Sequence, residues 1–152
     1  MLSKTDNEFL TRSGAGTPIG NLLRRFWVPA LLSAELPERE GPQKKIKILG
    51  EDLLAFRDTN GRVGIVEPHC PHRGANLYYG RNEECGLRCA FHGWKFDVDG
   101  NCVDLPTSPP ESSYKDTIKL LAYPVREWAD MIWVYMGPLE HMPELPQLEL
   151  GL

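Results

Sequence analysis

Four side chains that can bind a metal lie in two short stretches of the chain, Cys70 with His72 and Cys89 with His92. One residue separates the first pair, two residues separate the second pair, and sixteen residues lie between His72 and Cys89. Thiolate and imidazole are ligands that zinc sites and iron–sulfur centres share. The spacing therefore predicts a metal centre built by two tight loops, each supplying one thiolate and one imidazole.

The ligand types leave two kinds of centre open. A tetrahedral zinc ion would take all four side chains on one ion. In a Rieske [2Fe-2S] centre the two cysteines bind one iron and the two histidines bind the other, which a Cys–His pair on each loop also allows. Gly74 and Gly93 follow the two histidine stretches, and glycine lets backbone amides approach a centre closely.

The other histidines and cysteines have ordinary structural explanations. His69 adjoins Cys70, so its side chain is expected to point away from the metal, on the surface or in loop packing. Cys85 and Cys102 are expected to be small buried thiols, and His141, in a proline-rich tail, is expected to be solvated.

Trp94 and Phe96 directly follow the second loop and are expected to pack as hydrophobic side chains. Such packing also has a functional consequence, because a dry shell around a metal centre controls its solvent access and its reduction potential.

The rest of the sequence predicts a mostly antiparallel β fold. One short helix is expected over residues 17–27, with Thr17 as N-cap and Pro18 at the first helical position. Apolar, β-branched runs of strand length, separated by turn sequences such as DTNG and DVDG, predict a β sandwich or barrel. These runs occupy residues 44–50, 53–58, 62–67, 119–125 and 131–137.

The length and composition of the chain exclude several classes of function. A chain of 152 residues suits one domain, and 41% hydrophobic with 25% charged residues is the balance of a folded globular protein. The net charge of -4, with no basic run longer than two residues, argues against nucleic-acid binding. The longest apolar run near the start, FWVPALL, is too short for a bilayer, so we expect no membrane partner and a cytoplasmic location. Four cysteines in such a chain favour a metal or free thiols over disulfides.

The loop sequences resemble a known family. CPHRGANL, followed by CAFHGWKFDVDGNCVDLP, resembles the Rieske loops of Rieske non-haem iron oxygenase α subunits, most closely the phthalate dioxygenase and phenoxybenzoate dioxygenase branch. The resemblance continues in LTRSGAGTPIGNLLRRFWVPALL before the loops and in AYPVREWADMIWVYMGP after them, so it covers nearly the whole chain.

The resemblance implies a [2Fe-2S] cluster of the Rieske type, and its ligands would be Cys70, His72, Cys89 and His92. It implies a Rieske-type antiparallel β sandwich with a cluster-binding loop subdomain and one short N-terminal helix. The expected organisation is an N-terminal arm over residues 1–37, the Rieske domain over 38–137, and a linker stub over 138–152 that leads toward a catalytic domain.

In this family single electrons arrive from a flavin- or ferredoxin-type reductase and leave for a mononuclear iron. The resemblance makes His92 the exit toward that iron. It also gives Arg73 a role in supporting the cluster loop or contacting a neighbouring subunit, beside Gly74, Gly93 and Trp94.

The sequence departs from the family pattern where it stops, in the linker before the catalytic domain. With His72 and His92 committed to the cluster, only His69 and His141 remain, and no carboxylate is placed to complete a mononuclear iron site with them. We therefore expect no mononuclear iron in this chain, which alone would transfer electrons and not hydroxylate. The alternatives are a free-standing Rieske ferredoxin and, more remotely, a structural zinc module.

Overall fold

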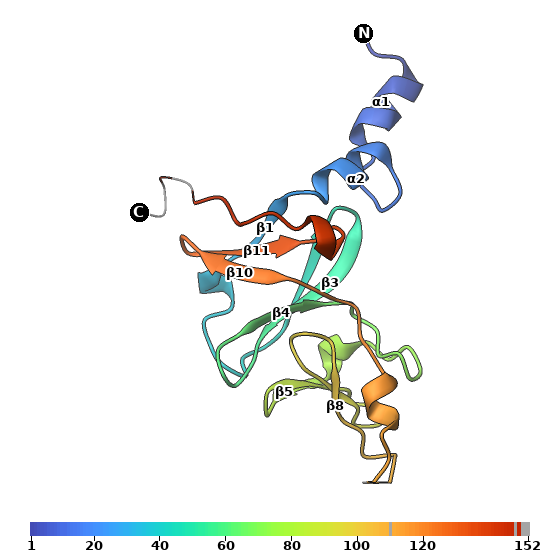
Figure 1. The fold of residues 1–152 in the computed structure, drawn as a ribbon, viewed down its shortest axis with the longest axis vertical. Coiled ribbons are helices and arrows are strands. Elements are labelled where there is room, and N and C mark those ends of the chain that lie inside the picture. The colour runs from blue at the N-terminus through green and yellow to red at the C-terminus, as the bar shows by residue number, and fades with distance from the viewer. Residues whose placement is uncertain (110, 148, 150–152) are drawn as a thin grey trace.

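The structure, a computed structural model, describes residues 1–109, 111–147 and 149. Within these ranges, eleven short strands form three antiparallel sheets, several of whose strands are labelled in Figure 1. The first sheet has the order β1 (Trp27–Leu32), β11 (Met131–Tyr135), β10 (Val125–Trp128). The second has the order β2 (Lys44–Ile48), β3 (Glu51–Arg57), β4 (Val63–Val66), β9 (Ala122–Tyr123). The third has the order β5 (Arg81–Glu83), β6 (Gly86–Arg88), β7 (Lys95–Phe96), β8 (Cys102–Asp104).

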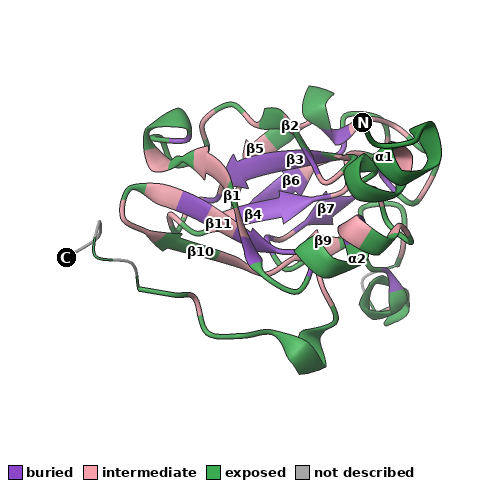
Figure 2. Ribbon diagram, turned by 90° about the horizontal axis from the view of Figure 1, so that it is seen from above, coloured by how far each residue is buried: buried purple, intermediate pink, exposed green. Residues whose placement is uncertain are grey.

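The second sheet is the middle layer of the molecule, and β3 shows why. Successive side chains of a strand point to opposite faces, and here both faces are buried. Leu53 and Ala55 belong to the core shared with the first sheet. Leu54 and Phe56 belong to the core shared with the third sheet, and β4 divides its side chains between the two cores in the same way. Figure 2 shows the buried segments gathered in these central strands.

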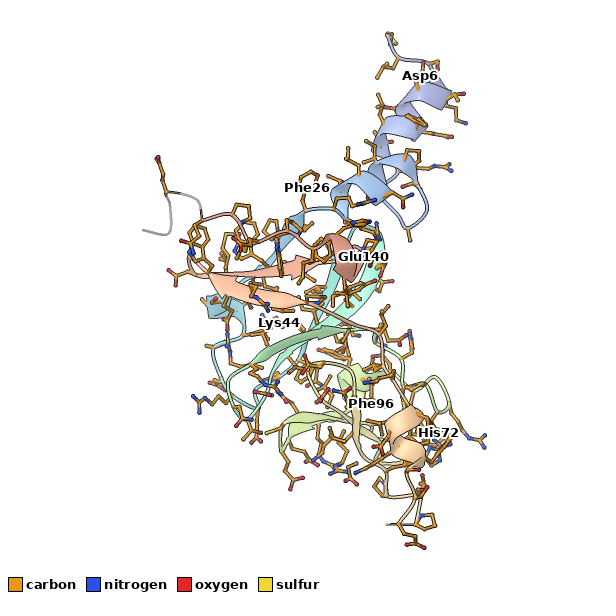
Figure 3. The ribbon with its side chains drawn as sticks, viewed as in Figure 1. Asp6, Phe26, Lys44, His72, Phe96 and Glu140 are labelled. Atoms are coloured by element: carbon orange, nitrogen blue, oxygen red, sulfur yellow. The ribbon has the colours of Figure 1, made fainter. Side chains whose placement is uncertain are left out.

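The third sheet and its loops form the end of the molecule remote from the N-terminus (Figure 1). Residues 67–80 run from β4 to β5 and include a single 3-10 turn, η2 (Leu77–Tyr79). Residues 89–94 connect β6 to β7. Both predicted metal-binding stretches therefore lie at one end of a rigid β scaffold, where Figure 3 places His72.

The N-terminal arm differs from the sequence prediction. It contains two helices, α1 (Lys4–Thr11) and α2 (Pro18–Leu23). The α2 helix has the expected Thr17 cap, but it ends before residue 24 and Trp27 already belongs to β1. The α1 helix was missed because none of its residues is buried, so it has no apolar stripe to reveal it.

Five strand regions were correctly predicted, with one interruption. The run over 119–125 forms β9, and β10 starts after Pro124, which cannot donate a ladder hydrogen bond. Strands β1 and β5 to β8 were not predicted, because β1 carries Pro29 and each strand of the third sheet has only two or three residues. Residues 126–128 of β10 were also not predicted, since the predicted run ends at residue 125. The remaining elements are single 3-10 turns, η1 (Ser33–Glu35), η3 (Tyr114–Thr117) and η4 (Leu139–His141). In the described ranges, every helix is too short or too polar to span a bilayer.

Candidate metal centre

The two predicted metal-binding loops share one backbone hydrogen-bond pattern. The Cys70 amide donates to the carbonyl of Ala75 at 2.9 Å, and the Gly74 amide donates to the Cys70 carbonyl at 2.9 Å. In the second loop the Cys89 amide donates to the Trp94 carbonyl at 2.8 Å, and the Gly93 amide donates to the Cys89 carbonyl at 3.0 Å. Each loop therefore closes around its cysteine over the same number of residues, although the histidine is one position later in the second loop.

The glycine of each loop is required by its backbone conformation. Gly74 has a φ angle of 69° and Gly93 has a φ angle of 77°. This left-handed region strains residues that carry a Cβ atom. The sequence predicted a glycine role from close approach of the backbone, and the structure adds the turn that each glycine makes.

The four candidate ligands form two pairs of like side chains. Cys70 and Cys89 are both free and buried, with exposures of 2% and 3%, and their thiols are close enough to interact. The rings of His72 and His92 meet edge to face with centroids 4.6 Å apart. In the described part of the chain, no three His, Cys, Asp or Glu side chains gather as ligands of one ion.

His72 is held by aromatic stacking and leaves one nitrogen free. Its ring lies parallel to that of Trp94, with centroids 4.4 Å apart and planes 5° apart. The Nδ1 atom of His72 is buried and has no hydrogen-bond partner in the part of the chain that the structure describes. Burial lowers the pKa of His72, and the neighbouring His92 and Arg73 lower it further. The imidazole is therefore favoured in its neutral form, which is the form that binds metals.

Burial also acts on the first cysteine. It raises the pKa of Cys70 to about 11, and the adjacent Cys89 thiol contributes in the same direction. A thiolate is the form that binds metal, so a positive metal ion would have to offset this cost.

The remaining site residues surround these pairs. Trp94 is 7% exposed, and its indole N–H donates to the Thr107 hydroxyl at 3.0 Å. Arg73 is exposed at the tip of the first loop. Phe91 lies 4.0 Å from His92 between ring centroids and is 61% exposed, so the second loop presents an aromatic side chain to solvent beside its histidine.

The other histidines and cysteines lie mostly as predicted. His69 and His141 are exposed, Cys102 is buried, and Phe96 is fully buried in the core beneath the loops. Cys85 differs from the prediction of a buried thiol. It is only partly buried, because it occupies the turn between β5 and β6 with a φ angle of 63°.

Two residues near the loops were not singled out from the sequence. Arg88 donates to the Gly93 carbonyl at 2.9 Å, and Thr107 accepts the Trp94 indole N–H. Arg88 directly precedes Cys89, so the pattern RCAFHG contained its position, whereas Thr107 lies in a Pro/Ser-rich segment without any local signal.

A mostly β scaffold that presents two cysteines and two histidines on a pair of matching loops has the features of a metal-binding domain. Residues 26–124 match the Rieske [2Fe-2S] domain family, which is more than half of the chain. The chain belongs to this family.

Curated relatives are oxygenase subunits. The chain is 51% identical over 150 residues to the 3-chlorobenzoate-3,4-dioxygenase oxygenase subunit of Comamonas testosteroni, an alignment that covers 99% of this chain and 34% of that protein. It is 46% identical over 144 residues to the phthalate 4,5-dioxygenase oxygenase subunit of Pseudomonas putida, covering 95% and 33% of the two chains. The chain thus spans about a third of the length of these relatives.

Solved structures give the same result. Apo dicamba monooxygenase matches with a TM-score of 0.74 at 29% identity, over 85% of this chain and 38% of that chain. The oxygenase in a ferredoxin complex of carbazole 1,9a-dioxygenase matches with a TM-score of 0.68 at 30% identity, over 84% and 33% of the two chains. The expected fold and the resemblance to Rieske oxygenase subunits, including the phthalate dioxygenase branch, are confirmed.

Proposed function

We propose that this chain is the electron-transfer domain of an aromatic-ring-hydroxylating oxygenase, with Cys70 and Cys89 binding one iron of a [2Fe-2S] cluster and His72 and His92 binding the other. The observation that carries the proposal is the pairing of like donors, thiol beside thiol and imidazole beside imidazole, across two loops. A Rieske cluster divides its ligands in this way, whereas one zinc ion would draw all four together.

The residues present fit such a cluster. Among the described residues the buried Nδ1 atom of His72 has no hydrogen-bond partner, and a metal bond would satisfy it. The two buried thiols lie among apolar side chains of the same core, so a cluster bound there would be shielded from water on the protein side. Both histidines are only partly buried, so the side of the cluster that they bind would face the surface.

When bound, the cluster would supply one-electron chemistry, and neutral imidazole ligands make such a centre easier to reduce than one with four thiolates. The protein residues would then hold the ligands, exclude water and offer a path for electrons. We propose His92 as the exit, because it lies at the tip of the second loop beside the exposed Phe91. Arg73 is exposed at the tip of the first loop, where it is available to a neighbouring subunit.

The partners follow from the relatives. Curated relatives are oxygenase subunits about three times as long as this chain, and one solved relative was captured with a ferredoxin. We propose that electrons reach this domain from a flavin- or ferredoxin-type reductase in the cytoplasm. They would then pass to a mononuclear iron in a catalytic domain outside these residues, and this chain would hold no mononuclear iron itself.

Metal and sulfide analysis of anaerobically reconstituted protein tests the proposal. We expect two irons and two acid-labile sulfides per chain, a red-brown colour, and a Rieske-type EPR signal after reduction with dithionite. One zinc and no sulfide would establish the structural zinc module instead. Three irons, or an oxygenated product from an aromatic acid with this chain as the sole oxygenase component, would contradict the electron-transfer role.

A further inference from the structure

An arginine that the electron-transfer role does not by itself require lies partly buried at the start of the second loop. The Arg88 side chain is 13% exposed and lies at the end of β6, directly before Cys89. Its guanidinium donates to the Gly93 carbonyl at 2.9 Å. That carbonyl belongs to the peptide joining Gly93 to Trp94, so Arg88 fixes the peptide between His92 and the tryptophan that stacks on His72.

Three carboxylates surround the guanidinium, and two of them accept hydrogen bonds from it. Its Nε atom donates to Glu83 on β5 at 2.6 Å, and one terminal nitrogen donates to Asp104 on β8 at 2.7 Å. The Gly93 carbonyl accepts from this same terminal nitrogen. An arginine anchored in this way has little freedom to move, because its planar fork is fixed at both sides.

The first loop has the same backbone hydrogen bonds but a different residue at this position. The residue before Cys70 is His69, whose side chain is exposed, whereas the residue before Cys89 is Arg88, whose side chain is only 13% exposed. The second loop is therefore closed by a side chain as well as by its backbone. Gly93 also passes close to Pro106, since a Cβ atom there would lie 3.3 Å from the proline Cγ.

We propose that Arg88 is a positioning residue for the cluster. By holding the Gly93–Trp94 peptide, Arg88 would fix His92 through the adjoining Gly93. It would also fix the Trp94 ring, which orients His72. This inference rests on the proposed ligand set. It extends that proposal by naming the residue outside the ligand set that determines how both histidines are presented.

The charges around Arg88 predict a second effect of its removal. Glu83 pairs with Arg88 and with Arg81, and Glu84 pairs with Lys95 at 2.9 Å and with Arg88 at 3.6 Å. Replacing Arg88 by a neutral residue leaves the Asp104 and Glu83 carboxylates less compensated next to the loop. The added negative charge would disfavour the reduced cluster and lower its potential.

Four variants of the full chain, reconstituted with the cluster, test the proposal. Arg88→Lys keeps the positive charge but loses the planar guanidinium with its several donors, and Arg88→Met loses both. Asp104→Asn removes the charge of one carboxylate that binds the guanidinium. Arg81→Met is the matched control, because Arg81 also binds Glu83 (2.8 Å) but is an exposed residue of β5, outside the second loop. The readouts are the EPR signal of the reduced protein, the potential by film voltammetry, and the rate of iron release to a chelator.

We expect Arg88→Lys and Asp104→Asn to change the EPR signal and to release iron about 10-fold faster, the scale of losses when residues that support metal ligands are removed. Arg88→Met should also have a lower potential, and Arg81→Met should match the wild type in its EPR signal and its rate of iron release. A wild-type EPR signal and release rate in Arg88→Lys would overturn the proposal, as would equal changes in Arg81→Met. If Arg88→Met fails to fold, the results for Arg88→Lys and Asp104→Asn still test the proposal. Failure of the wild-type chain to bind two irons would instead overturn the proposed function.

Discussion

The ring of His72 on the first loop lies flat against the ring of Trp94 on the second loop, with centroids 4.4 Å apart and planes 5° apart. The two loops therefore contact each other through a candidate ligand and a side chain that is not a ligand. A change at Trp94 should therefore alter how the His72 ring is held, although the two residues lie on different loops.

Trp94→Ala is expected to destabilise the folded protein by about 3–5 kcal/mol, as for other large buried aromatic side chains. Trp94→Phe retains a ring over His72 but loses the hydrogen bond to Thr107, so its cost should be about 1–2 kcal/mol. Guanidinium unfolding of the cluster-loaded protein measures both. Trp128→Phe, a partly buried tryptophan of β10, is the control. Visible circular dichroism of the cluster should change in Trp94→Phe and not in the control.

His92→Ala is expected to abolish the visible spectrum and to leave the loops disordered, while the first and second sheets remain folded. The loops are poor in apolar side chains, so the cluster would supply much of the free energy that orders them. Visible absorption, iron content and amide hydrogen exchange measure these effects. His69→Ala changes an exposed histidine next to Cys70 and should retain the cluster. A wild-type visible spectrum in His92→Ala would remove His92 from the ligand set.

The ion pair between Arg57 on β3 and Glu127 on β10 should make stability depend on pH. Two hydrogen bonds, of 2.6 and 2.8 Å, join the guanidinium to the carboxylate. The hydrogen bonds from Arg57 lower the pKa of Glu127 below 4.5. A carboxylate whose pKa is lowered in the folded state stabilises the protein at pH values above the ordinary pKa of that carboxylate. This contribution to stability is lost as the pH falls through the lowered pKa.

Glu127→Gln is therefore expected to be less stable than wild type at pH 7, by about 0.5–1 kcal/mol because the carboxylate is partly exposed. The difference in unfolding free energy between the two proteins should shrink as the pH falls below 4.5. Guanidinium unfolding at several pH values measures it, and Glu140→Gln, an exposed residue of η4, is the control. A difference that is constant from pH 7 to the acid range would show that the ion pair is not its source.

Arg24→Met should loosen the N-terminal arm from the sheets. Arg24 is 8% exposed and donates to the carbonyls of Ser13 and Leu49 and to the Glu51 carboxylate, which also accepts from the Tyr123 hydroxyl. Losing one partner of a largely buried pair typically costs about 3–5 kcal/mol, and partial exposure of Glu51 places this case at the lower end.

Limited proteolysis measures this loosening, and cleavage within residues 1–23 should be faster in Arg24→Met than in wild type. Arg25→Met changes the neighbouring exposed arginine and should have no effect. Equal cleavage of the two variants would mean that Arg24 does not hold the arm.

The sequence by itself determined which side chains could bind a metal and the long strands of the layered scaffold. Cys70, His72, Cys89 and His92 are recognisable because their spacing and the glycines that follow them are local properties of the chain. The long strands of the second sheet are recognisable for the same reason, since β3 and β4 are continuous apolar runs buried on both faces.

Only the tertiary structure decided how the loops are supported. Strands of two or three residues in the third sheet carry no alternating pattern, and they form because the layer beneath them buries their side chains. The stacking of Trp94 on His72 joins side chains from two loops, and Arg88 binds partners on β5 and β8. Such contacts depend on how distant segments meet in space, which residue spacing along one chain does not encode.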